Sequence, residues 1–111
     1  MVLPSLVYTV ALTLKERLRE LLGARLLEVR VFGSRARGDS RVDSDLDVFI
    51  LVDERDSALD SLVFRTVVEV ERDVDYPFPV SPRLMSRVHF EDLLQRERAI
   101  AQNILAEGVL I

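Results

Sequence analysis

The chain of 111 residues is long enough for one modest hydrophobic core and too short for two, so we expect a single domain over residues 1–111. Its hydrophobic share of 49% excludes a disordered chain, and its net charge of -4 excludes a global basic field that would attract a polynucleotide. The sequence has no cysteine for disulfides or thiolate metal sites, and no apolar run approaches the roughly 20 residues of a membrane span.

The N-terminal half of the chain alternates between helical and strand patterns. Residues Ser5–Leu22 carry apolar side chains at helical spacing. Residues Leu26–Phe32 alternate like a strand, and Leu46–Val52 is almost entirely apolar, as expected for a strand covered on both faces. Residues 53–57 predict a turn that leads into a helix over 58–72.

The C-terminal half begins with a strand that is rich in proline. Residues 78–85 predict an edge strand, because proline removes backbone donors and a strand paired on both sides does not tolerate their loss. Pro77 and Pro79 have the same parity, whereas Pro82 has the other parity and predicts a bulge or a strand end. The remaining expected elements are a helix over 90–107, broken near Gln95, and a short strand over 109–111.

Two carboxylates stand at the start of the second strand. Asp45 and Asp47 are two residues apart, so on a strand they project to one face with Cα atoms roughly 6.5 to 7 Å apart. They are placed to bind one divalent ion or to bridge two. Hard oxygen ligands without histidine or thiolate favour Mg²⁺ or Mn²⁺, and such ions also bind triphosphate oxygens.

A short polar turn connects the first two strands. Gly33 lets the backbone approach a phosphate, and the Ser34 hydroxyl adds one hydrogen bond to it. Arg35 and Arg37 bring permanent positive charge with planar donors. Ser44 is a further nucleotide-binding candidate, although it is also suited to fixing the turn before the aspartates. Each feature alone is common in loops without chemistry, so only their combined spacing indicates a nucleotide site.

Here the sequence resembles a known family. The residues Gly33-Ser34-Arg35-Ala36-Arg37-Gly38 followed by Ser44-Asp45-Leu46-Asp47 resemble the signature of the minimal nucleotidyltransferases of the DNA polymerase beta superfamily. The order of elements and the closing residues 104–110 are also similar to that family. The resemblance agrees with an α/β (α+β) fold of two layers, a small mixed sheet with helices mainly on one side. It implies that Gly33 and Ser34 hold the triphosphate and that Asp45 and Asp47 bind the metal ions.

The family commonly has a third carboxylate on the strand after the next helix. Here Asp73 and Asp75 precede the prolines, and the strand over 78–85 contains no acid. Asp75 is therefore the candidate for the third catalytic and metal-binding position. If Asp75 lies in a loop, the site is incomplete and transfer is slow, because the acceptor hydroxyl lacks a positioned base.

The resemblance implies a magnesium-dependent nucleotidyltransferase that moves AMP from ATP to a hydroxyl acceptor and releases pyrophosphate. It further implies a cytoplasmic antitoxin that acts on a HEPN-domain toxin partner. A hypothesis of a different class is a binding module that masks its partner and has a weak or inactive site. Adenylylation of a small molecule such as an aminoglycoside is disfavoured, because no second substrate-binding domain is present. Nucleic acid is not expected as a direct partner. Exposed edge strands are compatible with association into a homo-oligomer.

Overall fold

A computed structural model describes residues 3–75 and 77–111, which form a four-stranded sheet of order β3-β2-β1-β4. The strands are β1 (Leu26–Phe32), β2 (Leu46–Val52), β3 (Val80–Ser86) and β4 (Val109–Leu110). Strand β1 is antiparallel to β2 and β4, whereas β2 and β3 are parallel. This mixed sheet with packed helices confirms the expected fold class.

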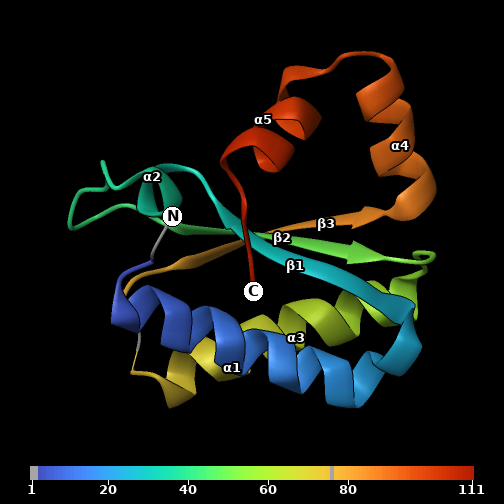
Figure 1. Ribbon diagram of the computed structural model, residues 1–111. Helices are drawn as coiled ribbons and strands as arrows, with labels where there is room; N and C mark the ends of the chain where they lie inside the picture. Colours follow the sequence, from blue (N-terminus) through green and yellow to red (C-terminus); the bar gives the residue numbers. More distant parts are fainter. Residues whose placement is uncertain (1–2, 76) are drawn as a thin grey trace.

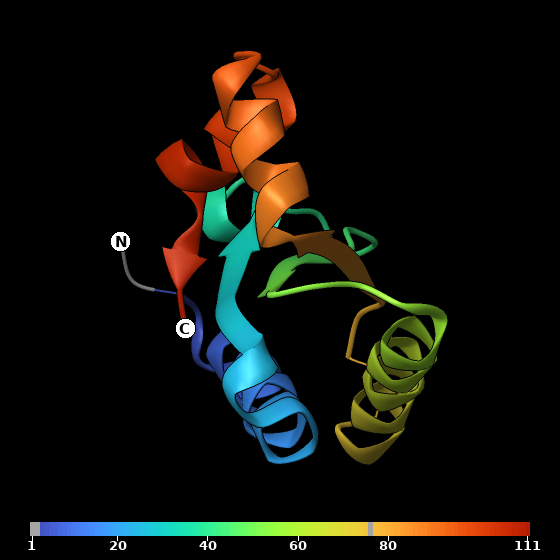
Figure 2. The same ribbon diagram turned by 90° about the vertical axis from the view of Figure 1, so that its right-hand side faces the viewer.

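The helices cover both faces of the sheet to different extents. Figure 1 shows the two long helices together on one face and two shorter helices on the other. The view in Figure 2 separates the same two groups. The long helices are α1 (Ser5–Leu22) and α3 (Ser57–Asp73), and the shorter ones are α4 (Arg87–Gln95) and α5 (Ala99–Glu107). Strand β1 is preceded by the 3-10 turn η1 (Gly23–Arg25) and followed by the one-turn helix α2 (Ser34–Arg37). None of the helices within the described ranges has the length and apolarity needed to cross a membrane.

The larger hydrophobic core lies between the sheet and the two long helices. One face of β2 contributes Leu46, Val48 and Ile50, which are 0% exposed. Helix α1 meets it with Leu14 and Leu18 among its buried residues, whose spacing of four keeps them on one side of the helix. Each such buried side chain contributes about 1.5–3 kcal/mol of transfer free energy. Because Leu46, Val48 and Ile50 face this core, the alternate residues of β2, which include Asp47, project from the opposite face of the sheet.

A second, smaller core lies on the opposite face of the sheet. Phe49 is 0% exposed and its ring packs at 4.8 Å from that of Phe90 on α4. The other buried residues of this core are Phe32, Leu51, Met85, Ala101 and Ile104. Asp47 is on the same face as Phe49 but is only partly buried. Thus α4 and α5 cover this face next to Asp47 and leave Asp47 itself in contact with solvent.

Strand β3 is the edge strand that its prolines predict, but the prediction for Pro82 is wrong. Pro82 pairs with Val48 in a continuous register and forms neither a bulge nor a strand end. The backbone N–H of Val80 donates to the Glu71 carboxylate and not to β2. Because residues two apart present their N–H groups to the same edge, the donor that Pro82 lacks would also point away from the sheet.

The C-terminal helices also differ in their bounds from the sequence prediction. Helix α4 begins at Arg87, three residues before the predicted start, because the Ser86 hydroxyl accepts a hydrogen bond from the backbone N–H of His89. The predicted break is confirmed, since α4 ends at Gln95 and Glu97 has a positive φ of 54°. Strand β3 begins at Val80, two residues later than predicted.

Candidate functional site

The turn after β1 places Gly33 against the carboxylate of Asp47. Gly33 has φ 75° and ψ -160°, a backbone conformation that is essentially restricted to glycine. A Cβ atom at this position would lie 2.2 Å from Oδ2 of Asp47. The carbonyl of Gly33 accepts hydrogen bonds from the N–H groups of Ala36 and Arg37, which close the single turn of α2. Both the backbone conformation and the close approach therefore require glycine here.

The two aspartates stand at the start of β2. Asp45 is exposed and directly precedes the strand, and Asp47 pairs with Phe32 of β1. Burial raises the pKa of the Asp47 carboxyl, and the negative charge of Asp45 raises it further. Arg83 and Arg37 act in the opposite direction. Ionised Asp47 thus carries an energetic cost that a bound cation would offset.

Arg35 holds the loop that leads to Asp45. Its Nε and Nη2 atoms donate to the carbonyl oxygen of Ser44 at 3.0 and 2.8 Å, and its guanidinium lies 4.1 Å from the ring centroid of Phe78. The Ser44 hydroxyl accepts a hydrogen bond from the backbone N–H of Arg41 at 2.8 Å. Arg35 and Ser44 therefore fix the backbone on the N-terminal side of Asp45, a role for Arg35 that its sequence position alone did not indicate.

Arg37 lies at the other side of the turn. Its Nη1 atom donates to Glu107 at 3.1 Å and its Nε atom donates to Asp39 at 3.3 Å. Because Glu107 is the last residue of α5, this ion pair connects the turn after β1 to the C-terminal helix. The charge of Arg37 also reaches Asp47, whose pKa it lowers. Ser34 is the first residue of α2, and its carbonyl accepts from the N–H of Gly38.

Asp75 is not on β3. It is exposed, has a positive φ of 64° and lies in the turn between α3 and the strand, five residues before Val80. Within the described ranges, no three acidic, histidine or cysteine side chains gather closely enough to hold a metal ion. The structure therefore brings Asp45 and Asp47 together without Asp75.

Strand β3 presents a different pair of side chains beside Asp47. The register places Ser81 opposite Asp47 and Arg83 opposite Phe49, on the same face of the sheet. Arg83 is exposed, and its charge lowers the pKa of Asp47. The sequence pattern alone does not single out Arg83, because its place beside Asp47 depends on the pairing of β3 with β2.

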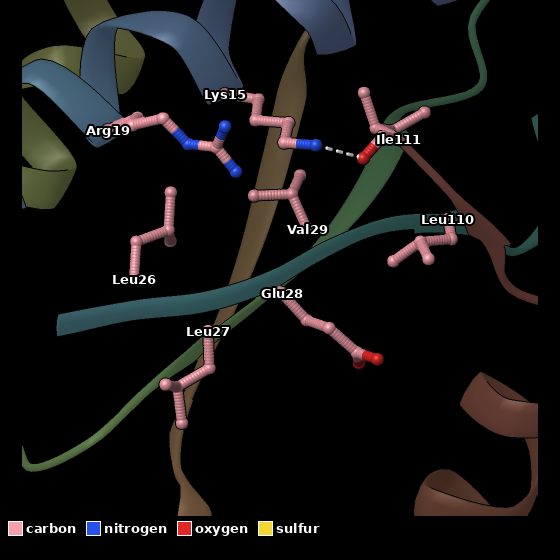
Figure 3. A pocket seen from close by; sticks show the side chains of 8 residues that line it. All are labelled: Lys15, Arg19, Leu26, Leu27, Glu28, Val29, Leu110 and Ile111. Carbon is pink, nitrogen blue, oxygen red and sulfur yellow. Dashed lines mark hydrogen bonds between the residues drawn. The ribbon is translucent and has the colours of Figure 1, made fainter. Parts of the chain in front are cut away.

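A pocket of about 280 Å³ lies away from these residues. Lys15 and Arg19 of α1 border it on one side and residues 26–29 of β1 on another, as Figure 3 shows. The chain end at Leu110 and Ile111 closes it, with Lys15 donating to the Ile111 carbonyl. None of the candidate residues lines this pocket, which therefore lies apart from the turn after β1.

Comparisons with known proteins show what the chain as a whole is similar to. A family model described as nucleotidyltransferase domain matches residues 12–109, which include the turn after β1 and both aspartates. The solved structure of a protein named as a minimal nucleotidyltransferase is similar, with 27% sequence identity and a TM-score of 0.56, and the match covers 95% of each chain. The comparison with curated proteins found no match.

A second solved structure is similar in fold. It is a toxin–antitoxin with AMP-PNP, and the matched chain is 16% identical with a TM-score of 0.54. The match covers 87% of this chain and 68% of that one. At this level of identity the likeness concerns the arrangement of the helices and strands. It adds independent support for the fold that positions the turn and the two aspartates.

Proposed function

Since the chain belongs to the nucleotidyltransferase domain family, we propose that it transfers AMP from ATP to a hydroxyl acceptor and releases pyrophosphate. The observation that supports this proposal best is the contact between the Gly33 turn and Asp47. Gly33, which has no side chain, lies directly against the carboxylate of Asp47, whose pKa is raised. Such an arrangement suits a triphosphate held by backbone groups on one side and by a metal ion on the other.

Asp45 and Asp47 are the residues that we propose to hold a divalent ion, Mg²⁺ or Mn²⁺. Their carboxylate oxygens are hard ligands, and the sequence offers no cysteine and a single histidine, His89 on α4. Asp75 lies outside this pair, so we propose two protein ligands. When bound, such an ion neutralises charge on the triphosphate oxygens and orients the reacting groups.

The remaining residues of the turn have distinct proposed roles. Gly33 and Ser34 contact the β- and γ-phosphates through the backbone and the Ser34 hydroxyl, and Arg37 supplies positive charge beside them. Arg35 and Ser44 act indirectly: they fix the loop that carries Asp45 and do not contact the nucleotide themselves. These residues would thus bind and orient the nucleotide and would not exchange protons with it.

The transfer itself is a displacement at the α-phosphorus. The acceptor oxygen forms a bond to this atom, the bond to the oxygen that bridges the α- and β-phosphates breaks, and pyrophosphate leaves with that electron pair. The hydroxyl proton leaves to solvent or to a base on the acceptor, because β3 presents Ser81 and Arg83 and no carboxylate beside Asp47. The rate of transfer therefore depends strongly on whether the acceptor supplies a base for its hydroxyl proton.

The proposed acceptor is a hydroxyl of a HEPN-domain toxin, with this chain as the antitoxin. The fold likeness to a chain of a toxin–antitoxin structure supports this assignment. The exposed position of Asp45 supports it too, since a second protein can reach the reacting groups directly. A partner is then required both to complete the site and to accept the nucleotide.

A second candidate function is masking of the partner without transfer. It is favoured by one observation: within the described residues, no third acidic side chain is placed to hold a metal ion together with Asp45 and Asp47. In that case the nucleotide site is weak or regulatory, and the partner is silenced by binding alone.

The two functions are distinguished by following label from ATP labelled at the α-phosphate. The chain is incubated with Mg²⁺ and with a HEPN-domain protein, the proposed acceptor. Transfer predicts label on that protein, which disappears in the Asp45→Asn/Asp47→Asn variant. Masking predicts a complex that silences the partner in both forms, without label.

A further inference from the structure

The face of the sheet that carries Asp47 continues onto β3 with one exposed cation. Parallel pairing sets Ser81 opposite Asp47 and Arg83 opposite Phe49. The burial of their neighbours fixes the side on which they project. Val80 and Leu84 pack in the larger core, whereas Met85 packs with Phe49 on the opposite face. Ser81 and Arg83 therefore share the face of Asp47.

Arg83 differs from Arg35 and Arg37 in having no carboxylate or carbonyl partner among the described residues. Arg35 donates to Ser44, and Arg37 is paired with Asp39 and Glu107. Within residues 3–75 and 77–111, the side chain of Arg83 takes part in no hydrogen bond or ion pair, and it is exposed. Its donors are thus available to a ligand that occupies the space above Asp47.

The Gly33 turn, Asp47 and Arg83 follow one another across three neighbouring strands of the sheet. Strand β2 lies between β1 and β3, so Asp47 separates the Gly33 turn at the end of β1 from Arg83 on β3. A triphosphate whose outer phosphates lie at the Gly33 turn and whose metal ion lies at Asp47 extends its α-phosphate toward β3. A guanidinium has five donors in a fixed plane and binds phosphate oxygens in pairs.

We propose that Arg83 is a phosphate-binding residue of this site and contacts the α-phosphate of the nucleotide. The inference rests on the proposed function and adds to it a residue on β3. Positive charge near the α-phosphate favours attack by the acceptor oxygen, while the same charge opposes binding of a metal ion in the absence of nucleotide.

The test measures two binding constants of the full chain by titration calorimetry. Arg83→Ala is expected to bind ATP with Mn²⁺ about tenfold more weakly than the unchanged protein, the loss typical of one charge-assisted contact. The same variant is expected to bind Mn²⁺ alone more tightly, because a nearby positive charge has been removed. A loss of folding would weaken both, so opposite shifts identify an electrostatic role at the site. Arg83→Lys should retain part of the ATP affinity.

The matched control is Arg87→Ala, because Arg87 is also exposed and begins α4 four residues later. It should leave both constants unchanged. The inference is overturned if the unchanged protein binds ATP with Mn²⁺ and Arg83→Ala binds it equally well. If the unchanged protein binds no ATP at all, the proposed function itself fails, and that result is distinct from a failure of Arg83 alone.

Discussion

The carboxylate of Asp47 occupies the space that a side chain at position 33 would need. A Cβ atom on Gly33 would lie 2.2 Å from Oδ2 of Asp47, which is far inside van der Waals contact. The contact forms because Asp47 pairs with Phe32, the residue immediately before Gly33. Pairing of β1 with β2 thus brings the turn and the carboxylate of the candidate site together, so the geometry of these residues depends on the stability of the sheet.

The first prediction concerns Gly33→Ala. The backbone conformation of Gly33 costs a non-glycine residue about 1–3 kcal/mol, and displacement of Asp47 adds to the loss. Urea unfolding should show this destabilisation, and calorimetry should show loss of ATP binding in the presence of Mn²⁺. Gly38→Ala is the control, since Gly38 has φ 87° but open space around its Cα. It should lose about 1 kcal/mol and keep ATP binding.

The second prediction concerns Asp47→Asn and pH. Because the pKa of Asp47 is raised in the folded protein, the folded state holds this proton more tightly than the unfolded state. The contribution of Asp47 to stability therefore falls as pH rises from the ordinary aspartate range through the raised pKa. At neutral pH and without metal, Asp47→Asn should unfold at a higher urea concentration than the unchanged protein.

Metal provides the check on that prediction. Mg²⁺ or Mn²⁺ should raise the unfolding midpoint of the unchanged protein and have little effect on Asp47→Asn, because the bound cation offsets the cost of the ionised carboxylate. An Asn variant that is less stable than the unchanged protein at neutral pH, and equally responsive to metal, contradicts the assigned role.

The third prediction separates the structural role of Arg35 from its charge. Arg35→Lys keeps the charge but loses the paired donors to the Ser44 carbonyl and the planar contact with Phe78. We expect Arg35→Lys and Arg35→Ala each to lose about 1–2 kcal/mol in urea unfolding. Both should weaken ATP binding by loosening the loop before Asp45. Arg65→Ala, at an exposed position of α3, should change neither property. Full stability in Arg35→Lys would refute the loop-fixing role.

The fourth prediction concerns the outer edge of β3. The Glu71 carboxylate accepts the backbone N–H of Val80 at 2.9 Å, a donor that β2 does not reach. Removing the acceptor in Glu71→Ala should cost about 1 kcal/mol in urea unfolding, whereas Glu71→Gln retains an oxygen acceptor and should lose less. Glu69→Ala is the exposed control on the same helix and should be neutral. Equal effects at positions 69 and 71 would show that the edge contact contributes nothing.

Local patterns in the sequence predicted the elements that position the site. The bounds of α1, β1 and β2 are confirmed as predicted, because helical spacing and strand alternation are both strong there. The break between α4 and α5 was also predicted. Pro82 was misread, because whether a missing N–H faces a neighbour or solvent depends on the register of β3 with β2. That register joins residues far apart in the chain and is not encoded in local periodicity.

The same limit applies to the site residues. The spacing of Gly33, Asp45 and Asp47 identified the family, and the family model confirms that identification. The direction of the Arg35 side chain depends on the folded path of residues 39–45, so its bonds to Ser44 were not foreseeable from its charge. Arg83 was missed because its place beside Asp47 depends on the register of β3 with β2, which pairs Ser81 with Asp47 and Arg83 with Phe49.

The central claim is that the Gly33 turn and the two aspartates form one metal-dependent nucleotide site. Titration calorimetry of ATP into the chain, with and without Mn²⁺, tests it most directly when the Asp45→Asn/Asp47→Asn variant is measured alongside. We predict binding by the unchanged protein that requires Mn²⁺ and is lost in the double variant, while the variant remains folded. ATP binding that is indifferent to Mn²⁺ and to the loss of both carboxylates would contradict the claim.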